Sequence, residues 1–149
     1  MKIALRPAAQ FNGRYRLTVP SPTMNDLPPP VALALIVAET VTVDPRTKRL
    51  TAHGIFHRID QCPVRLDFSI LAFVTEVTRP VELLAAVLDP DDNPIHHTKW
   101  SIDCTDPFGV HGLVARSIDV EFPRPGVYRV QVSCDGVAVA EQPLRVGMG

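Results

Sequence analysis

Four residues in the middle of the chain, His96, His97, Cys104 and His111, are of types that could hold a metal ion. Zinc accepts imidazole nitrogen and thiolate sulfur. Neighbouring residues of an extended strand point to opposite faces, so only one of His96 and His97 can face a shared ion. The spacing to Cys104 and His111 matches no recognised zinc pattern. We therefore treat the four as weak metal candidates, and we expect half-buried histidines and no cofactor.

Cys104 and His111 could also be considered as a thiol–imidazole pair, with Ser101 and Asp103 nearby. A catalytic nucleophile needs an adjacent base. It also needs an activating setting of its own, such as a helix N-terminus, an oxyanion loop or a nucleophile elbow. The sequence around these residues shows none of these settings, and its glycines form no phosphate-binding motif. We expect a protein that is not an enzyme. A metal- or thiol-dependent enzyme is kept as a less favoured alternative.

Trp100 is the single tryptophan of the chain. On a strand it shares a face with Ile102, which favours a place in the core. An exposed indole would instead favour a carbohydrate-binding accessory module that uses Trp100, His96 and the His111 loop. This ligand-binding function is the second alternative. The acidic run at 89–93 offers calcium-type oxygens without the glycine and distal glutamate of an EF-hand, so a solvated turn is expected there.

These residues must be positioned by strands, because no segment shows a helical period. Apolar or alternating segments, separated by turn signals, recur at short intervals over residues 31–38, 41–43, 50–56, 66–74, 81–88, 95–102, 114–122, 127–134 and 137–146. The first of them is apolar throughout and predicts a central strand covered on both faces. Residues 103–112 predict a loop. The pattern is typical of an all-β sandwich.

The last two strands carry the clearest structural signal. Residues 128, 130, 132 and 134 share an apolar face, and Asp135-Gly136 predicts a two-residue hairpin turn. Tyr128 follows Gly126 at the entry of the penultimate strand, as in the tyrosine corner of sandwich domains. We therefore expect an immunoglobulin-like antiparallel β-sandwich of about seven to nine strands, with structural roles for Gly126, Tyr128, Asp135 and Gly136.

Two hairpins also carry a resemblance. Residues 38–44 with 48–56, ending in Gly54-Ile55-Phe56, and residues 125–136, with Pro125-Gly126 and Asp135-Gly136, are similar to those of a small, uncharacterised bacterial family. The resemblance covers residues 31–146 and implies a β-sandwich without a known activity. Many members have a Cys-Asp pair where this chain has Ala38-Glu39, which argues against thiol chemistry there.

The first thirty residues differ from the rest. They carry four basic residues against Asp26, a net charge of +3, and two proline-rich breaks, whereas the remainder carries −4. We predict an N-terminal arm and linker over 1–30 and a sandwich over 31–149, with Met24 as a possible start of the compact part. Within the arm, Arg14, Tyr15, Arg16, Leu17 and Val19 form an alternating stretch that can add a strand to an open sheet edge.

Composition limits the remaining possibilities. The chain has 15 basic and 16 acidic residues, so no overall field favours nucleic acid or an anionic membrane. Three scattered cysteines and no recognisable signal peptide favour reduced thiols and a cytoplasmic location. The function expected is a non-enzymatic protein–protein interaction or assembly module, with another protein or a second copy as partner.

Overall fold

The computed structural model describes residues 28–103 and 106–148, which contain nine β-strands and no helix. The all-β prediction is confirmed, and no described helix is long and apolar enough to cross a bilayer. The strands are β1 (Val31–Val43), β2 (Leu50–Ile55), β3 (Arg58–Ile59), β4 (Val64–Thr75), β5 (Val81–Leu88), β6 (Pro94–Ile102), β7 (His111–Phe122), β8 (Gly126–Cys134) and β9 (Val137–Val146).

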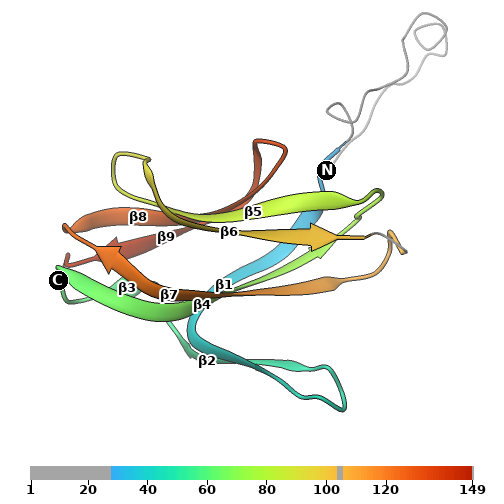
Figure 1. Ribbon diagram of the computed structural model, residues 1–149, viewed down its shortest axis with the longest axis horizontal. Coiled ribbons are helices and arrows are strands. Elements are labelled where there is room, and N and C mark those ends of the chain that lie inside the picture. Colours follow the sequence, from blue (N-terminus) through green and yellow to red (C-terminus); the bar gives the residue numbers. More distant parts are fainter. Residues whose placement is uncertain (1–27, 104–105, 149) are drawn as a thin grey trace, which may run out of the picture.

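The strands form two facing sheets (Figure 1). One sheet has the order β2-β1-β4-β7 and the other the order β3-β9-β8-β5-β6. The chain changes sheet five times, between β2 and β3, β3 and β4, β4 and β5, β6 and β7, and β7 and β8. Apart from the short parallel pair β3–β9, all pairings are antiparallel. This is the immunoglobulin-like arrangement that the sequence predicts.

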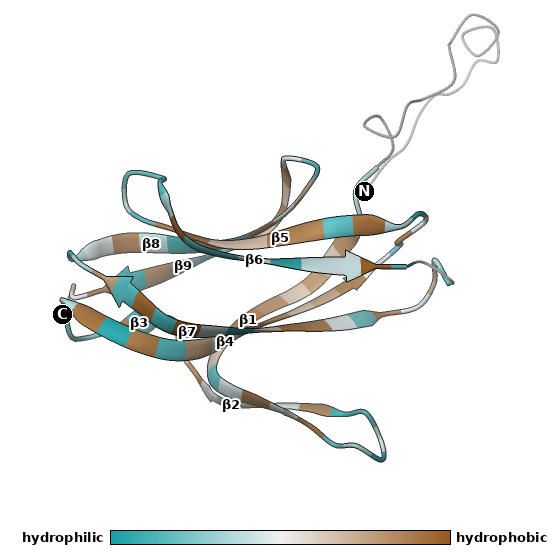
Figure 2. Ribbon diagram, viewed as in Figure 1, coloured by the Kyte–Doolittle hydropathy of each residue, from teal (hydrophilic) through white to brown (hydrophobic). Residues whose placement is uncertain are grey.

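The core lies between the two sheets and follows the period-2 pattern of the strands. On β4, the residues from Phe68 to Val74 that face inward are at most 1% exposed. On β8, the inward face runs from Tyr128 to Cys134 and is buried along its whole length. Figure 2 shows hydrophobic and hydrophilic residues alternating along these strands. The alternation of the sequence therefore translates directly into the buried face.

The second half of the β1–β2 hairpin belongs to the first sheet but leaves β4 after Ala38 and folds back under β4 and β7. We call residues 39–56 the flap. In Figure 1, β2 lies on the far side of β4 and β7 from the second sheet. The backbone carbonyl of Glu39 accepts a hydrogen bond from Arg116 of β7 at 3.2 Å, and a Cβ added to Gly112 of β7 would lie 2.8 Å from Leu50. The flap thus forms a partial third layer against β7.

Three local predictions from the sequence are wrong. Residues 31–38 are not covered on both faces, because Leu33 is 56% exposed ahead of the point where the flap turns back. Residues 41–43 continue β1 instead of forming a separate strand. β7 begins at His111, so the last part of the expected 103–112 loop pairs with β4.

Candidate interaction surface

Trp100 lies on β6 and belongs to the core. The residue is 9% exposed, and its indole Nε1 donates a hydrogen bond to the carbonyl oxygen of Val114 on β7 at 3.1 Å. An indole held in this way offers no open face to a sugar ring. The carbohydrate-binding alternative therefore loses the aromatic residue on which it depended.

The weak metal candidates form no ligand set in the described part of the chain. Cys104 lies outside it, and the residues that it includes contain no group of three His, Cys, Asp or Glu side chains that could hold an ion. The Nε2 atoms of His96 and His111 are buried there without a hydrogen-bond partner, whereas His97 is exposed. Burial, followed by the neighbouring His97, lowers the pKa of His96. His96 is therefore a half-buried imidazole whose surroundings disfavour its charged form.

Cys134 is a core thiol on β8. It is 2% exposed, and burial, followed by the charge of Asp135, raises the pKa of its thiol. A protonated, enclosed thiol is a poor nucleophile. Cys62 is also a free thiol, and its Sγ lies 3.6 Å from the carbonyl oxygen of Phe122. Neither cysteine has the setting of a catalytic residue.

Tyr128 closes the corner between β7 and β8. It is fully buried, and its hydroxyl donates a hydrogen bond to the carbonyl oxygen of Arg124 at 2.8 Å. Its ring packs edge-on against Phe122, with 5.1 Å between centroids. Gly126 is required by close approach, because a Cβ there would lie 2.6 Å from Pro90. A buried tyrosine whose hydroxyl bonds to the backbone a few residues upstream is the arrangement of a tyrosine corner.

The turn between β8 and β9 is a two-residue hairpin turn. Asp135 and Gly136 both have positive φ angles, of 53° and 80°, and the flanking Cys134 and Val137 are paired. Two central residues with positive φ are the mark of a type I′ hairpin turn. The Asp135 carboxylate also receives a hydrogen bond from Arg79 at 3.0 Å.

The acidic turn between β5 and β6 is satisfied by neighbouring groups of the protein. Asp89 accepts hydrogen bonds from two backbone amides of its own turn, those of Asp91 and Asn93. The bond from Asn93 has the larger effect and lowers the pKa of the Asp89 carboxyl. Arg124 pairs with Asp91, and Arg129 pairs with Asp92. The carboxylates that could be mistaken for calcium ligands are therefore engaged by arginines.

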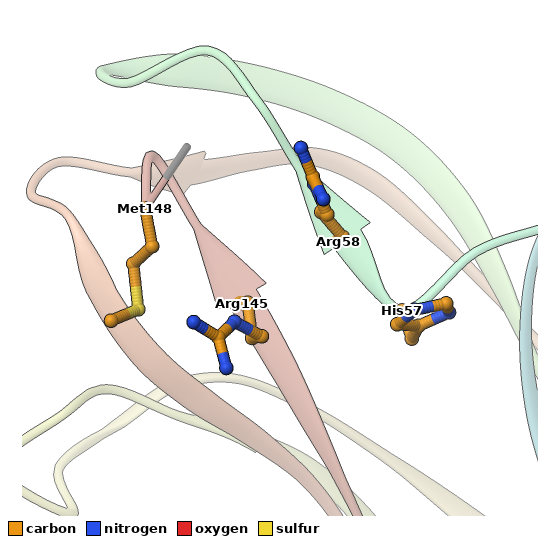
Figure 3. A pocket seen from close by; sticks show the side chains of 4 residues that line it. All are labelled: His57, Arg58, Arg145 and Met148. Carbon is orange, nitrogen blue, oxygen red and sulfur yellow. The ribbon is translucent and has the colours of Figure 1, made fainter.

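A small pocket lies where β3 runs beside β9. It has a volume of about 260 Å³ and is lined by His57, Arg58, Arg145 and Met148 (Figure 3). Arg58 pairs with Asp60 at 2.9 Å. In Figure 3 the side chains of Arg58 and Arg145 extend in different directions. The pocket is basic, but its two arginines do not converge as a clamp for one anion.

The flap encloses a larger groove against the first sheet. This groove has a volume of about 720 Å³, and its apolar lining comes from Val43 and Leu50 of the flap and from Phe73, Val110 and Val114. Val43 is 52% and Val110 58% exposed. The flap therefore covers the sheet incompletely and leaves apolar side chains open to solvent.

Phe108 lies beside this groove, in the loop before β7. It is 90% exposed and lines an adjoining hollow of about 440 Å³ with Thr75 and Glu76. The loop is ordered against β4, because Thr75 donates a hydrogen bond to the carbonyl oxygen of Gly109 at 2.8 Å. A large aromatic side chain held in solvent beside an apolar groove is a typical mark of a contact surface. The flap-end patch is defined here as Val43, Leu50, Phe73, Phe108 and Val110.

The sequence did not single out this patch. Its residues come from β1, β2, β4 and one loop, and only the fold of the flap brings them together. The one available signal was Phe108 itself, an aromatic residue between Pro107 and Gly109 in a segment predicted to be a loop. The interaction residues that were predicted from sequence, Arg14 to Val19, lie outside the described residues.

Comparisons with known proteins give a family without a function. A family model described as "Family of unknown function (DUF6941)" matches residues 33–147. No curated protein matches the chain. Among solved structures, the chain is similar to an immunoglobulin-like protein from Pseudomonas aeruginosa, with 13% sequence identity and a TM-score of 0.34 over 76% of this chain and 91% of that chain.

Proposed function

The chain belongs to the DUF6941 family of unknown function, and on that premise we propose that it is a non-enzymatic protein–protein interaction module. One observation carries the proposal. The polar residues that could do chemistry are buried, engaged in pairs or far from one another, whereas the exposed side chains of Val43, Phe108 and Val110 lie together at the flap end. In small sandwiches, loops and edges carry function more often than the core.

The open edge of β2 is the place where a partner strand can add. β2 pairs with β1 alone in the described part of the chain, and all six of its residues are exposed or of intermediate burial and lie outside the core. Addition of a strand would satisfy the free backbone groups of this edge. We propose that residues 14–19 of the arm add here, either in their own chain or in a second copy. Exchange between copies would give a homodimer.

Hydrogen exchange of the full chain tests the arm. The amides of residues 14–19 should exchange more slowly than those of an unfolded peptide, and Leu17→Pro should abolish that protection because proline has no N–H to donate. Ala9→Pro is the matched control, a proline placed in the arm but outside the stretch, and it should leave the protection in place. Free exchange of residues 14–19 in the unaltered chain would show that the arm does not pair.

The cytoplasmic location is also a proposal, and its observable consequence is the state of the thiols. Cys62 and Cys134 are unbridged, and a reducing compartment keeps such thiols free. Mass measurement without reductant should show three free cysteines. An intramolecular bridge would overturn this proposal. The two hairpin motifs, at 38–56 and 125–136, are our proposed marks of the family, which an alignment of its members can test.

A further inference from the structure

The flap-end patch has an apolar centre and two charged flanks of opposite sign. Lys48 and Arg49 lie on the flap side, where they line the groove with Val43 and Leu50. Glu76 lies on the other side, where it lines the hollow beside Phe108. Phe73 and Val110 line the groove, and Thr75 and Phe108, each two residues away in the same segment, line the hollow, so the two adjoin. Basic side chains therefore border the groove, and an acidic side chain borders the adjoining hollow.

These flanking charges make no ion pair with any residue that the structure describes. In the described part of the chain, Lys48, Arg49 and Glu76 form no ion pair, whereas seven other basic residues there do. Asp106, on the acidic side, makes no ion pair among those residues either; its carboxylate accepts a hydrogen bond from the backbone amide of Phe108 at 2.9 Å and fixes the loop that presents the aromatic ring. As far as the described residues are concerned, both flanks are available to an external charge.

From this arrangement we propose that the flap-end patch is a two-fold contact between two copies of this chain. A two-fold axis places the same patch on both sides of the contact, so the patch must be complementary to itself. Rotation about an axis through the apolar centre brings Lys48 and Arg49 of one copy over Glu76 and Asp106 of the other. Phe108 of each copy then lies against the apolar groove of its neighbour. This inference rests on the proposed interaction function and names its partner.

A second copy fits the patch better than the arm does. The arm has a net charge of +3, so it matches the acidic flank but is repelled by Lys48 and Arg49. A second copy offers both signs in the required order. Charge complementarity of this kind selects the partner and its orientation, while the apolar centre supplies most of the affinity.

The first test is sedimentation equilibrium of the full chain from about 5 to about 500 µM. The unaltered chain should dimerise in this range, and Phe108→Ser should raise the dissociation constant at least about tenfold. Ile118→Ser is the matched control, because Ile118 is 64% exposed on β7 and lies outside the patch. This control should dimerise like the unaltered chain. A chain that stays monomeric, or an equal effect of the two variants, would overturn the inference.

Charge exchange gives a second, independent test. Lys48→Glu and Glu76→Lys should each weaken the dimer, because each places like charges opposite one another across the axis. The double variant should recover most of the affinity, since both pairs then have opposite signs again. A double variant that is weaker than either single one would contradict the two-fold arrangement. Neither side chain is in the core, so the variants test the contact and not the fold.

The arm variant separates this inference from the proposed pairing of the arm. If Leu17→Pro removes the dimer and Phe108→Ser does not, the arm is the contact and the two-fold patch is wrong. If Phe108→Ser removes the dimer while residues 14–19 exchange freely, the patch is right and the arm pairing is wrong. The two proposals therefore fail by different results.

Discussion

The two ends of the sandwich differ in how far the protein itself pairs their charges and buries their aromatic side chains. At the corner end, formed by residues 89–93 and 122–129, Tyr128 is buried and hydrogen-bonded, and Arg124 and Arg129 neutralise the neighbouring aspartates. At the flap end, Phe108 is 90% exposed beside an open groove, and Lys48 and Arg49 form no ion pair with a described residue. Both ends consist of β-strands and the turns that connect them.

The difference shows which end stabilises the fold and which is available to a partner. The corner end shows that this chain can pair its charges and enclose its aromatic residues where the fold requires it. The flap end does not, although its loop is held in place by the hydrogen bond from Thr75 to Gly109. Ordered yet unsatisfied surface is expected at an interface. The predictions below ask whether the two ends respond differently to substitution.

The largest effect is expected at the corner. Tyr128→Ala should lower the free energy of unfolding by about 3–5 kcal/mol, because it removes a fully buried ring and leaves a cavity. Tyr128→Phe, which keeps the ring and removes the hydrogen bond to Arg124, should cost about 1 kcal/mol. Denaturant unfolding measures both. A Tyr128→Ala protein as stable as the parent would refute the structural role of this end.

A smaller loss of stability is expected where the flap contacts the sheet. Gly112→Val should cost about 1–3 kcal/mol by overpacking, because a side chain at this position meets Leu50 and Phe73. The flap should be displaced, and the amides of residues 40–43 should exchange faster. Leu50→Ala, added to this variant, should recover part of the loss. Full stability of Gly112→Val would mean that the flap does not lie against the sheet.

The corner end could be predicted from the sequence in far more detail than the flap end. Tyr128 bonds to Arg124, four residues before it, so local turn chemistry and alternation were enough there. The same holds for the Asp135-Gly136 turn at the other end of β8. Most strand positions followed for the same reason. The period-2 pattern reports which residues share a face of a strand, and it does so without knowledge of the partner.

The flap end depends on contacts that are distant in the sequence. The fold-back of β1 is visible only in pairs such as Leu50 with Gly112 and Glu39 with Arg116. The apolar run at 31–38 therefore predicted cover on both faces, although Leu33 stays exposed. Likewise, Phe108 and Val43 form one surface only after the flap has turned back. No spacing within a strand encodes that contact.

Acid should weaken the protein through His96, which follows the acidic turn of the corner end. Its pKa in the folded protein lies below the ordinary value of 6.5, so the unfolded chain binds the proton more tightly. Above pH 6.5, His96 takes nothing from the stability of the fold. As the pH falls from 6.5 toward the lower pKa of the folded protein, the free energy of unfolding decreases. His96→Gln should flatten the decrease between about pH 7 and pH 5. The exposed His97→Gln should do so less, and equal slopes for the parent and His96→Gln would contradict the assignment.

The smallest effect on stability is expected at Phe108. Phe108→Ser should change the free energy of unfolding by less than about 0.5 kcal/mol when measured on dilute protein, because the ring packs on little of the fold. Its effect on dimerisation should be large by comparison. A loss comparable to that of Tyr128→Ala would mean that Phe108 stabilises the monomer, and the contrast between the two ends would disappear.

Hydrogen exchange of the unaltered full chain at about 5 and about 500 µM tests the division between the two ends most directly. At the higher concentration, the account predicts slower exchange at residues 43–50 and 106–112 and unchanged exchange at 89–93 and 122–129. Slower exchange at the corner end, or no dependence on concentration anywhere, would contradict it.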